Sequence, residues 1–280
     1  MVTRYGIGQP IRRVEDKRFL TGRGTYVDDI QLPHMTYGML VLSPHAHARI
    51  RKIDTAAAKA APGVLAVVTG ADLQADGIGG IFGMLPEDVG GPKGFRAPRP
   101  LLASDKVRHV GDRVAFVVAE TLEQARDAAE LVEVDYRDEP AVADIAEATR
   151  PGAPRVWDEA PGNIVFDWSI GDEAATEAAF RDAAHVTRVD LVNNRVVVAS
   201  MEPRNALGAY DAGEDRYTLY TGSQGVHSMR GILAGTTLQV PPEKVRVVTY
   251  DVGGGFGMKA YVYPEHGLVL WASKRIGRPV

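Results

Sequence analysis

The stretch Val245–Lys259, VRVVTYDVGGGFGMK, sets the expectations for the rest of the chain. Its β-branched opening predicts a strand, and four of the five residues in Gly253–Gly257 are glycines. Glycine has no Cβ, so such a loop can adopt backbone angles closed to other residues and let a bulky ligand approach the main chain. The following PEHGLVLWASKRIG, residues 264–277, predicts a helix. A strand, a glycine loop and a helix often present backbone N–H groups to an anion.

Two common uses of such a loop do not fit the spacing. A phosphate-binding P-loop has the pattern GxxxxGK[ST], but Lys259 does not directly follow Gly257. A dinucleotide-binding loop has the pattern GxGxxG, whereas the spacing here is Gly253-x-Gly255-x-Gly257. A tight structural turn packed on a helix remains the alternative to a ligand-binding loop.

Composition excludes several classes of protein. The chain has 280 residues, enough for about two domains. Its 32 Lys and Arg against 36 Asp and Glu give a net charge of −4, which argues against a nucleic-acid partner. No apolar run approaches the roughly 20 residues of a membrane helix, and the first residues lack an apolar signal core, so we expect a cytoplasmic location. With no cysteine, the chain cannot hold a disulfide, a thiolate zinc site or a cysteine-ligated iron–sulfur cluster.

The first half of the chain predicts alternating short elements. The first thirty or so residues show no periodicity and predict an extended arm with turns. Gly77–Pro100, rich in glycine and proline, predicts a long loop that is functional or mobile. Patterns of apolar residues predict a short helix over 55–61 and strands over 35–42, 48–54 and 64–70.

A strand–helix–strand unit comes next. Residues 112–120 predict a strand, 122–131 a helix, and 132–137 a second strand. Thr121 and Gln124 have the spacing of a capping box. This order predicts a βαβ-like unit. Further on, the patterns predict helices over 173–184 and 224–238 and strands over 164–172, 196–199, 206–210 and 217–220.

Several long motifs, in order, resemble one family. DVGGGFGMK, preceded by YTGSQGVHSMRGILAGTTLQVPPEKVRVV, is similar to the molybdenum-cofactor subunit of the xanthine dehydrogenase, aldehyde oxidase and aerobic carbon monoxide dehydrogenase family. GIGQPIRRVEDKRFLTGRGTYVDDI and LVLSPHAHARI resemble the N-terminal part of that subunit. PLLASDKVRHVGDRVAFVVAETLEQARDAAELVEVDY resembles its α/β hammerhead domain, and SMEPRNALGAYD resembles the first motif of its cofactor domain.

The resemblance implies a mixed α+β fold, in which the hammerhead domain is followed by the first part of a molybdenum-cofactor-binding domain. The boundaries expected from it are an N-terminal arm at residues 1–18, the hammerhead at 19–140, a linker at 141–163 and a partial cofactor domain at 164–280.

The same resemblance implies which residues meet the cofactor. Gln224 matches a glutamine whose amide approaches an oxygen ligand of molybdenum, and an amide can donate a hydrogen bond without adding charge. Gly254, Gly255, Phe256 and Gly257 match the loop beside the metal and the pterin. The alternatives are that Gln224 is simply a polar residue at a helix N-terminus and that Phe256 fills the core.

Other polar residues have plainer explanations. His45 and His47 would share a face of a strand, as a metal pair needs, but no third ligand is near in sequence, and a structural turn is favoured. Glu202 could be a base, but pairing with a cation is favoured. Glu265 is expected in a first helical turn, where the helix dipole stabilises a carboxylate. Arg204 is a weaker candidate for a pterin phosphate.

The chain is therefore predicted to be a portion of the molybdopterin-binding subunit of a carbon monoxide- or aldehyde/N-heterocycle-oxidising enzyme. A purine substrate is disfavoured, because Ala260 stands where the xanthine-oxidising branch has a glutamate. The family's catalytic glutamate lies beyond the matched region, so no catalytic residue and no direct metal ligand is assigned here. We expect either a truncated gene product or one piece of a split subunit.

The cofactor and partners follow from the same resemblance. Molybdenum-molybdopterin, in its cytosine dinucleotide form, is expected in the complete enzyme and not on this chain alone. The expected partners are an iron–sulfur subunit, an FAD subunit, the remainder of the large subunit and a small-molecule substrate. One alternative is a non-catalytic assembly module that docks the iron–sulfur and flavin subunits, and another is a free-standing nucleotide-binding protein.

Overall fold

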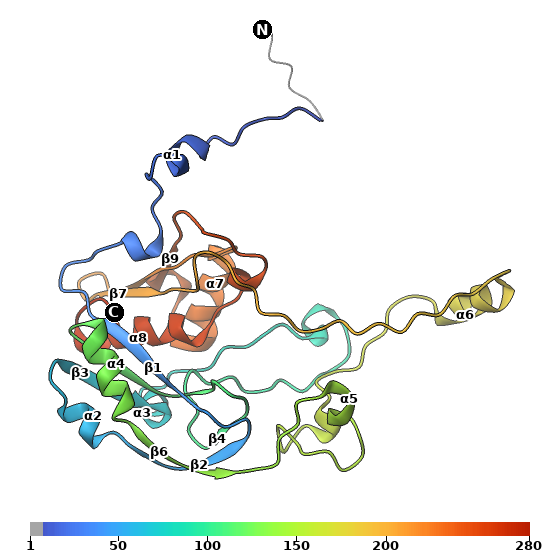
Figure 1. Cartoon of the computed structure of the whole chain (residues 1–280), viewed down its shortest axis with the longest axis horizontal. Helices are drawn as coiled ribbons and strands as arrows, with labels where there is room; N and C mark the ends of the chain where they lie inside the picture. The colour runs from blue at the N-terminus through green and yellow to red at the C-terminus, as the bar shows by residue number, and fades with distance from the viewer. Residues whose placement is uncertain (1–7) are drawn as a thin grey trace, which may run out of the picture.

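The first half of the chain forms two small antiparallel sheets (Figure 1). The computed structural model of the chain describes residues 8–280. One sheet has the order β1-β5-β3, and these strands span Tyr37–Leu42, Arg113–Ala119 and Val64–Thr69 respectively. The other has the order β4-β2-β6, and these strands span Lys106–Val107, Ala48–Asp54 and Glu133–Asp138. The strands predicted over 35–42, 48–54 and 64–70 are thus confirmed.

Short helices surround these sheets. The α4 helix (Leu122–Glu130) packs on β1 and β5. The predicted capping box is confirmed, because Thr121 Oγ1 accepts from Gln124 N and Gln124 Oε1 accepts from Thr121 N. The loop predicted over 77–100 is present and contains one short turn of helix. The helical segments of this half are α1 (Asp16–Leu20), η1 (Val27–Asp29), α2 (Ala56–Ala60), α3 (Gly70–Ala75), η2 (Pro86–Val89) and α4 (Leu122–Glu130).

The predicted βαβ unit is wrong in its pairing. The strand, the helix and the second strand are all present, but β5 and β6 lie in different sheets. The β5 strand pairs antiparallel with β1 and β3, because its run Val114–Ala119 is buried and needs a neighbour on each side. The helix α1 also corrects the expectation of an arm without helical structure, and residues 1–7 of that predicted arm lie outside the described residues.

The second half builds a third sheet in which one pair of strands is parallel. Its order is β7-β8-β9, with β7 and β8 antiparallel and β8 and β9 parallel. The strands span Leu207–Asp211, Arg216–Tyr220 and Val245–Val248, close to the predictions. The helical segments are α7 (Val226–Ile232), the π-helical η4 (Leu233–Leu238), η5 (Pro242–Lys244), η6 (Met258–Ala260) and α8 (Pro264–Ile276). The α7 and η4 segments together confirm the helix predicted over 224–238.

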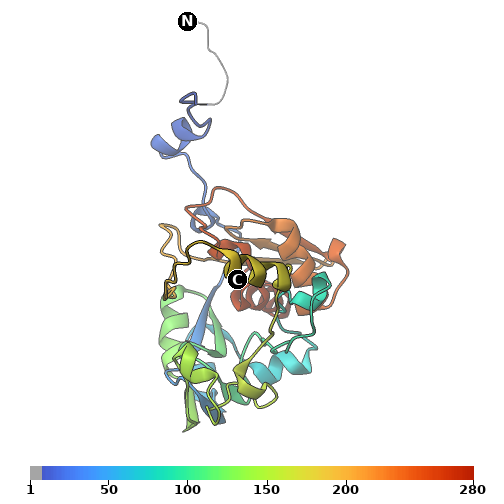
Figure 2. The ribbon, with the colours of Figure 1, turned by 90° about the vertical axis from the view of Figure 1, so that its right-hand side faces the viewer.

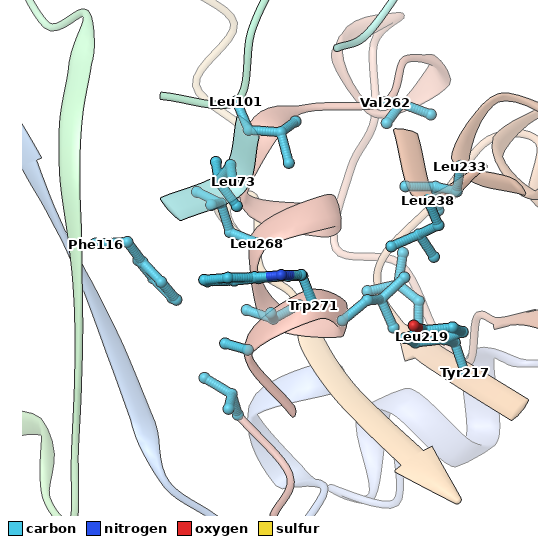
Figure 3. Close-up of a cluster of buried hydrophobic side chains, with 14 of the residues drawn as sticks. Leu73, Leu101, Phe116, Tyr217, Leu219, Leu233, Leu238, Val262, Leu268 and Trp271 are labelled. Carbon is cyan, nitrogen blue, oxygen red and sulfur yellow. The ribbon is translucent and has the colours of Figure 1, made fainter. Parts of the chain in front are cut away.

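The main hydrophobic core joins the two halves. Trp271 and Leu268 of α8 lie at its centre (Figure 3), with Phe116 of β5 and Leu73 of α3 on one side and Leu219 of β8 on the other. All five side chains are buried. Because these groups come from residues 73 to 271, the first and second halves of the chain pack as one body.

A long segment between the two halves projects from this body (Figures 1 and 2). It contains α6 (Glu173–Asp182), whereas α5 (Ile145–Ala148) and η3 (Pro161–Asn163) precede it and lie nearer the body (Figure 1), where the Arg108 guanidinium lies over the Trp157 ring. The predicted helix over 173–184 is confirmed. The strands predicted over 164–172 and 196–199 are wrong, because both stretches lack strand structure.

Candidate functional site

The parallel pair β8 and β9 brings two loops together. Parallel strands end at the same edge of a sheet, so the loop after Tyr220 and the loop after Val248 leave side by side. Thr221 N donates to Val248 O at 3.1 Å, which continues the pairing past the strand ends. Ser223 N then donates to Thr249 Oγ1 at 3.2 Å. The TGSQG motif, residues 221–225, and the glycine loop, residues 253–257, are therefore neighbours, although they lie 28 to 36 positions apart along the chain.

Gln224 is held against the glycine loop by its backbone and its side chain. Its N–H donates to Lys259 O at 3.0 Å, and its Oε1 accepts from Gly257 N at 3.0 Å. The amide oxygen is therefore used within the protein. Within the described part of the chain, no acceptor is bonded to its Nε2. The free end of this exposed side chain is thus a neutral hydrogen-bond donor.

The glycine loop turns sharply around that side chain. Gly254 and Gly257 have φ of 100° and 85°, in the region that favours glycine. A Cβ on Gly255 would lie 2.5 Å from Gln224 Oε1, so a larger residue there would displace the Gln224 side chain from its present position. Among residues 8–280, no acceptor is bonded to the backbone N–H groups of Gly254, Gly255 or Phe256. Three successive free donors beside a free amide can receive an anionic, oxygen-bearing group.

Phe256 does not fill the core. Its side chain is 78% exposed and its φ is 49°, which is uncommon for an aromatic residue. The alternative of a core plug is therefore wrong.

A buried ion pair fixes the start and the end of the loop. Lys259 is 2% exposed, and its Nζ lies 2.6 Å from Glu202 Oε2. The same oxygen accepts from Gly253 N at 2.8 Å, and Oε1 accepts from Asn205 at 3.0 Å. The predicted cation partner of Glu202 is thus confirmed, but sequence reasoning missed that it is Lys259.

This pairing also sets the charge of Glu202. Burial raises the pKa of its carboxyl, but the hydrogen bonds from Lys259, Gly253 and Asn205 outweigh burial, so the pKa lies below its ordinary value. Glu202 is therefore an ionised anchor and not a base poised to accept a proton.

The N-terminal segment fastens Asp251, which lies two positions before the first glycine. Arg18 donates to both carboxylate oxygens of Asp251, and Thr25 N donates to Asp251 Oδ2 at 2.8 Å. The Arg18 hydrogen bond is the main reason why the pKa of Asp251 lies below its ordinary value. Sequence reasoning missed this contact, which joins positions 233 residues apart.

The other candidates have local structural partners. Arg204 donates to Glu265 Oε1 at 2.8 Å and its guanidinium lies over the Tyr263 ring. His45 pairs with Asp138, and the Nδ1 of His47 lies 2.7 Å from Pro140 O. No cluster of three His, Cys, Asp or Glu side chains able to hold a metal occurs within residues 8–280. The same residues contain no helix long and apolar enough to cross a membrane.

The buried His266 contacts the TGSQG loop from the protein interior. His266 accepts from Tyr263 N through Nδ1 at 3.1 Å, and its Nε2 lies 3.3 Å from Thr221 Oγ1, directly behind the TGSQG loop. Burial lowers the pKa of His266 to about 4, so the ring is neutral at pH 7.

Comparison with known proteins matches both halves of the chain. Residues 21–140 match the family described as "Aldehyde oxidase and xanthine dehydrogenase, a/b hammerhead domain", and residues 156–280 match "Molybdopterin cofactor-binding domain".

Individual relatives agree with these family matches. The carbon monoxide dehydrogenase large chain of Afipia carboxidovorans is 38% identical over 98% of this chain and 34% of its own length. The nicotine 6-hydroxylase large subunit of Paenarthrobacter nicotinovorans is 38% identical over 100% of this chain and 33% of its own. The crystal structure of quinoline 2-oxidoreductase from Pseudomonas putida 86 superposes with a TM-score of 0.87 at 38% identity, over 96% of this chain and 33% of that one. The chain thus spans about a third of the length of the relatives it matches.

Proposed function

The chain belongs to the molybdenum hydroxylase large subunits of the aldehyde oxidase and xanthine dehydrogenase family, and we propose that it supplies one wall of their cofactor site. Gln224, Gly254, Gly255, Phe256 and Gly257 form that wall. The observation that carries the proposal is the donor set, in which three unbonded backbone N–H groups lie beside the unbonded amide nitrogen of Gln224.

These residues fit the group that the family uses. Molybdopterin and the oxygen ligands of molybdenum are anionic acceptors, and the loop offers donors that carry no charge. Gly255 leaves room for the Gln224 amide, and the Glu202–Lys259 pair holds the loop without directing its own charge into the site. When bound, the cofactor would supply the redox chemistry, while this wall would orient it through hydrogen bonds.

We propose that the wall is insufficient by itself. The charged groups nearest the loop, Glu202, Lys259 and Asp251, are all engaged in ion pairs, so none is a free base. The base and the remaining cofactor contacts would come from polypeptide that corresponds to the two thirds of the relatives that this chain does not match. We therefore expect the chain alone neither to retain molybdenum cofactor nor to turn over an aldehyde or N-heterocycle.

The proposal extends to cofactor form and partners. Without cysteine, this chain cannot carry the iron–sulfur centre that would remove the electrons, which supports a separate iron–sulfur subunit beside an FAD subunit. The cytosine dinucleotide form of the cofactor and a cytoplasmic location belong to the same proposal. Carbon monoxide, aldehydes and N-heterocycles are the proposed substrate classes, supported by Ala260 at the position expected to hold purine.

Substitutions in the wall test this function. The chain is co-expressed with a polypeptide comprising the unmatched part of the Afipia carboxidovorans relative, in a host that makes molybdenum cofactor. We expect Gln224→Ala and Gly255→Val to lower the molybdenum and pterin content of the complex, the second because any side chain there displaces Gln224. His227→Ala, an exposed change on α7, is the control. Equal cofactor content in all three variants would contradict the proposal.

A further inference from the structure

Residues 167–201, here called the apolar arm, lie mostly outside the packed body of the chain. Figure 1 shows the arm leaving the body, reaching α6 at its far end and returning as an extended strand-like path to β7. Building on the proposed function, we propose that the arm is the docking surface for the polypeptide that completes the large subunit. Its returning part, residues 184–199, would enter a β-sheet of that polypeptide.

The returning part carries exposed apolar side chains among polar ones. Val189 is 67% exposed, Leu191 is 85% exposed and Val197 is 90% exposed. Val186, Val192 and Val196 are also mostly exposed. A stable monomer rarely leaves six large apolar side chains of one segment in water, because each gains roughly 1.5–3 kcal/mol on burial. Burial of these side chains against another polypeptide would therefore be favourable.

The backbone of the same stretch is also unpaired. In the part of the chain that the structure describes, residues 184–199 make no backbone hydrogen bond. Their sequence is nevertheless rich in β-branched residues, which favour strands. Successive side chains of a strand point to opposite faces, so Val189 and Leu191 would share one face and Val192 would lie on the other. Apolar residues on both faces are typical of a strand buried within a sheet.

The base of the arm is attached to the candidate site. Glu202 N donates to Gly253 O at 3.1 Å, and Ser200 Oγ donates to Glu202 O at 2.7 Å. A Cβ on Gly254 would lie 3.0 Å from Ser200 Cβ. Whatever covers the arm therefore lies beside the glycine loop as well.

These positions favour one occupant. The chain matches about a third of the length of each of these relatives, so most of the large subunit lies outside the match. That polypeptide must reach the open side of the glycine loop if it supplies the base. A second copy of this chain would bring only the same wall again.

Hydrogen exchange on the complex tests the docking surface directly. The probe is the unmatched part of the Afipia carboxidovorans large chain, co-expressed with this chain and also fused behind Val280, so that weak association does not limit the fused form. We expect the amides of residues 186–198 to exchange fast in the chain alone and at least about tenfold more slowly with the probe.

Matched variants provide the control. Val189→Asp/Leu191→Asp places charges on the arm, and Met84→Asp/Val110→Asp places them on similarly exposed apolar residues elsewhere. Recovery of the co-expressed probe should fall at least about tenfold with the first pair and stay unchanged with the second.

Each other outcome overturns the docking proposal. These outcomes are no complex and no protection in the fusion, equal recovery for both variant pairs, or a dimer of this chain that the arm variants abolish. A complex that holds molybdenum but leaves the arm unprotected would overturn the docking surface and spare the proposed function. A complex that protects the arm without holding molybdenum would overturn the proposed function and spare the docking surface.

Discussion

At the scale of single residues, Lys259 holds the glycine loop through Glu202. It is almost fully buried and neutralises Glu202, which in turn holds Gly253. Lys259→Met removes the cation and leaves a buried carboxylate unpaired, and breaking such pairs typically costs about 3–5 kcal/mol. We expect a loss of this size in the free energy of unfolding measured with urea.

A surface ion pair provides the control for this variant. Lys244 pairs with Asp215 where both side chains are substantially exposed, so Lys244→Met should cost less than about 1 kcal/mol. Equal losses for Lys259→Met and Lys244→Met would show that the buried pair does not hold the loop.

His266 makes stability depend on pH. Its pKa is about 4 in the folded chain and 6.5 ordinarily, so the unfolded chain binds more protons between these values. Above pH 6.5 this difference contributes about 3 kcal/mol to the free energy of unfolding. The contribution is lost as the pH falls toward 4. Urea unfolding at about pH 7.5 and about pH 5 should show His266→Gln to be less sensitive to pH than the parent chain, whereas the exposed His227→Gln should match the parent. An unchanged pH dependence in His266→Gln would count against the buried neutral ring.

At the scale of elements, the close crossing of β7 and α8 sets the position of the third sheet. A Cβ on Gly208 would lie 2.6 Å from the backbone carbonyl of Val269, and backbone cannot move aside cheaply. Gly208→Ala should therefore lower the melting temperature and cost about 1–3 kcal/mol. Gly235→Ala, at an exposed helical position with no atom within 4 Å of the new Cβ, should be neutral or stabilising by up to about 1 kcal/mol. Similar melting temperatures for both variants would contradict this packing.

Local sequence predicted the elements better than their pairing. Strands such as β1 and β3, and the Thr121–Gln124 cap, follow from residues that are close in sequence. The pairing of β5 depends on strands up to 82 residues away, so the order strand–helix–strand suggested a βαβ unit that does not exist. Residues 196–199 have the composition of a strand, but a strand also needs a hydrogen-bonded neighbour, and none is present for them in residues 8–280.

For the candidate site too, the sequence predicts single residues better than the contacts between them. Its glycine loop stands out in the sequence, and the family resemblance indicates Gln224. The contacts that shape the site, Lys259 with Glu202 and Arg18 with Asp251, join residues 57 and 233 positions apart. A charge in a sequence does not state its partner, so only the folded chain identifies these pairs.

At the scale of the whole molecule, the packed body and the apolar arm should differ in resistance to protease. Arg181, Arg188 and Arg195 lie on the exposed arm, whereas α8 and the sheets share one buried core. Brief trypsin treatment should cut first within residues 181–195, apart from trimming near the N-terminus, because exposed segments open at little cost. The two large fragments should co-elute through the shared core. Earlier cleavage within the body would contradict this description.

We propose that this chain holds one wall of a molybdenum site and that the part of the large subunit outside the match holds the rest. The most direct test is the molybdenum and pterin content of the chain purified alone from a host that makes the cofactor, compared with the chain co-expressed with the unmatched part of its carbon monoxide dehydrogenase relative. We predict almost no molybdenum in the first sample and near-stoichiometric molybdenum in the second. Near-stoichiometric molybdenum in the chain alone would contradict the claim.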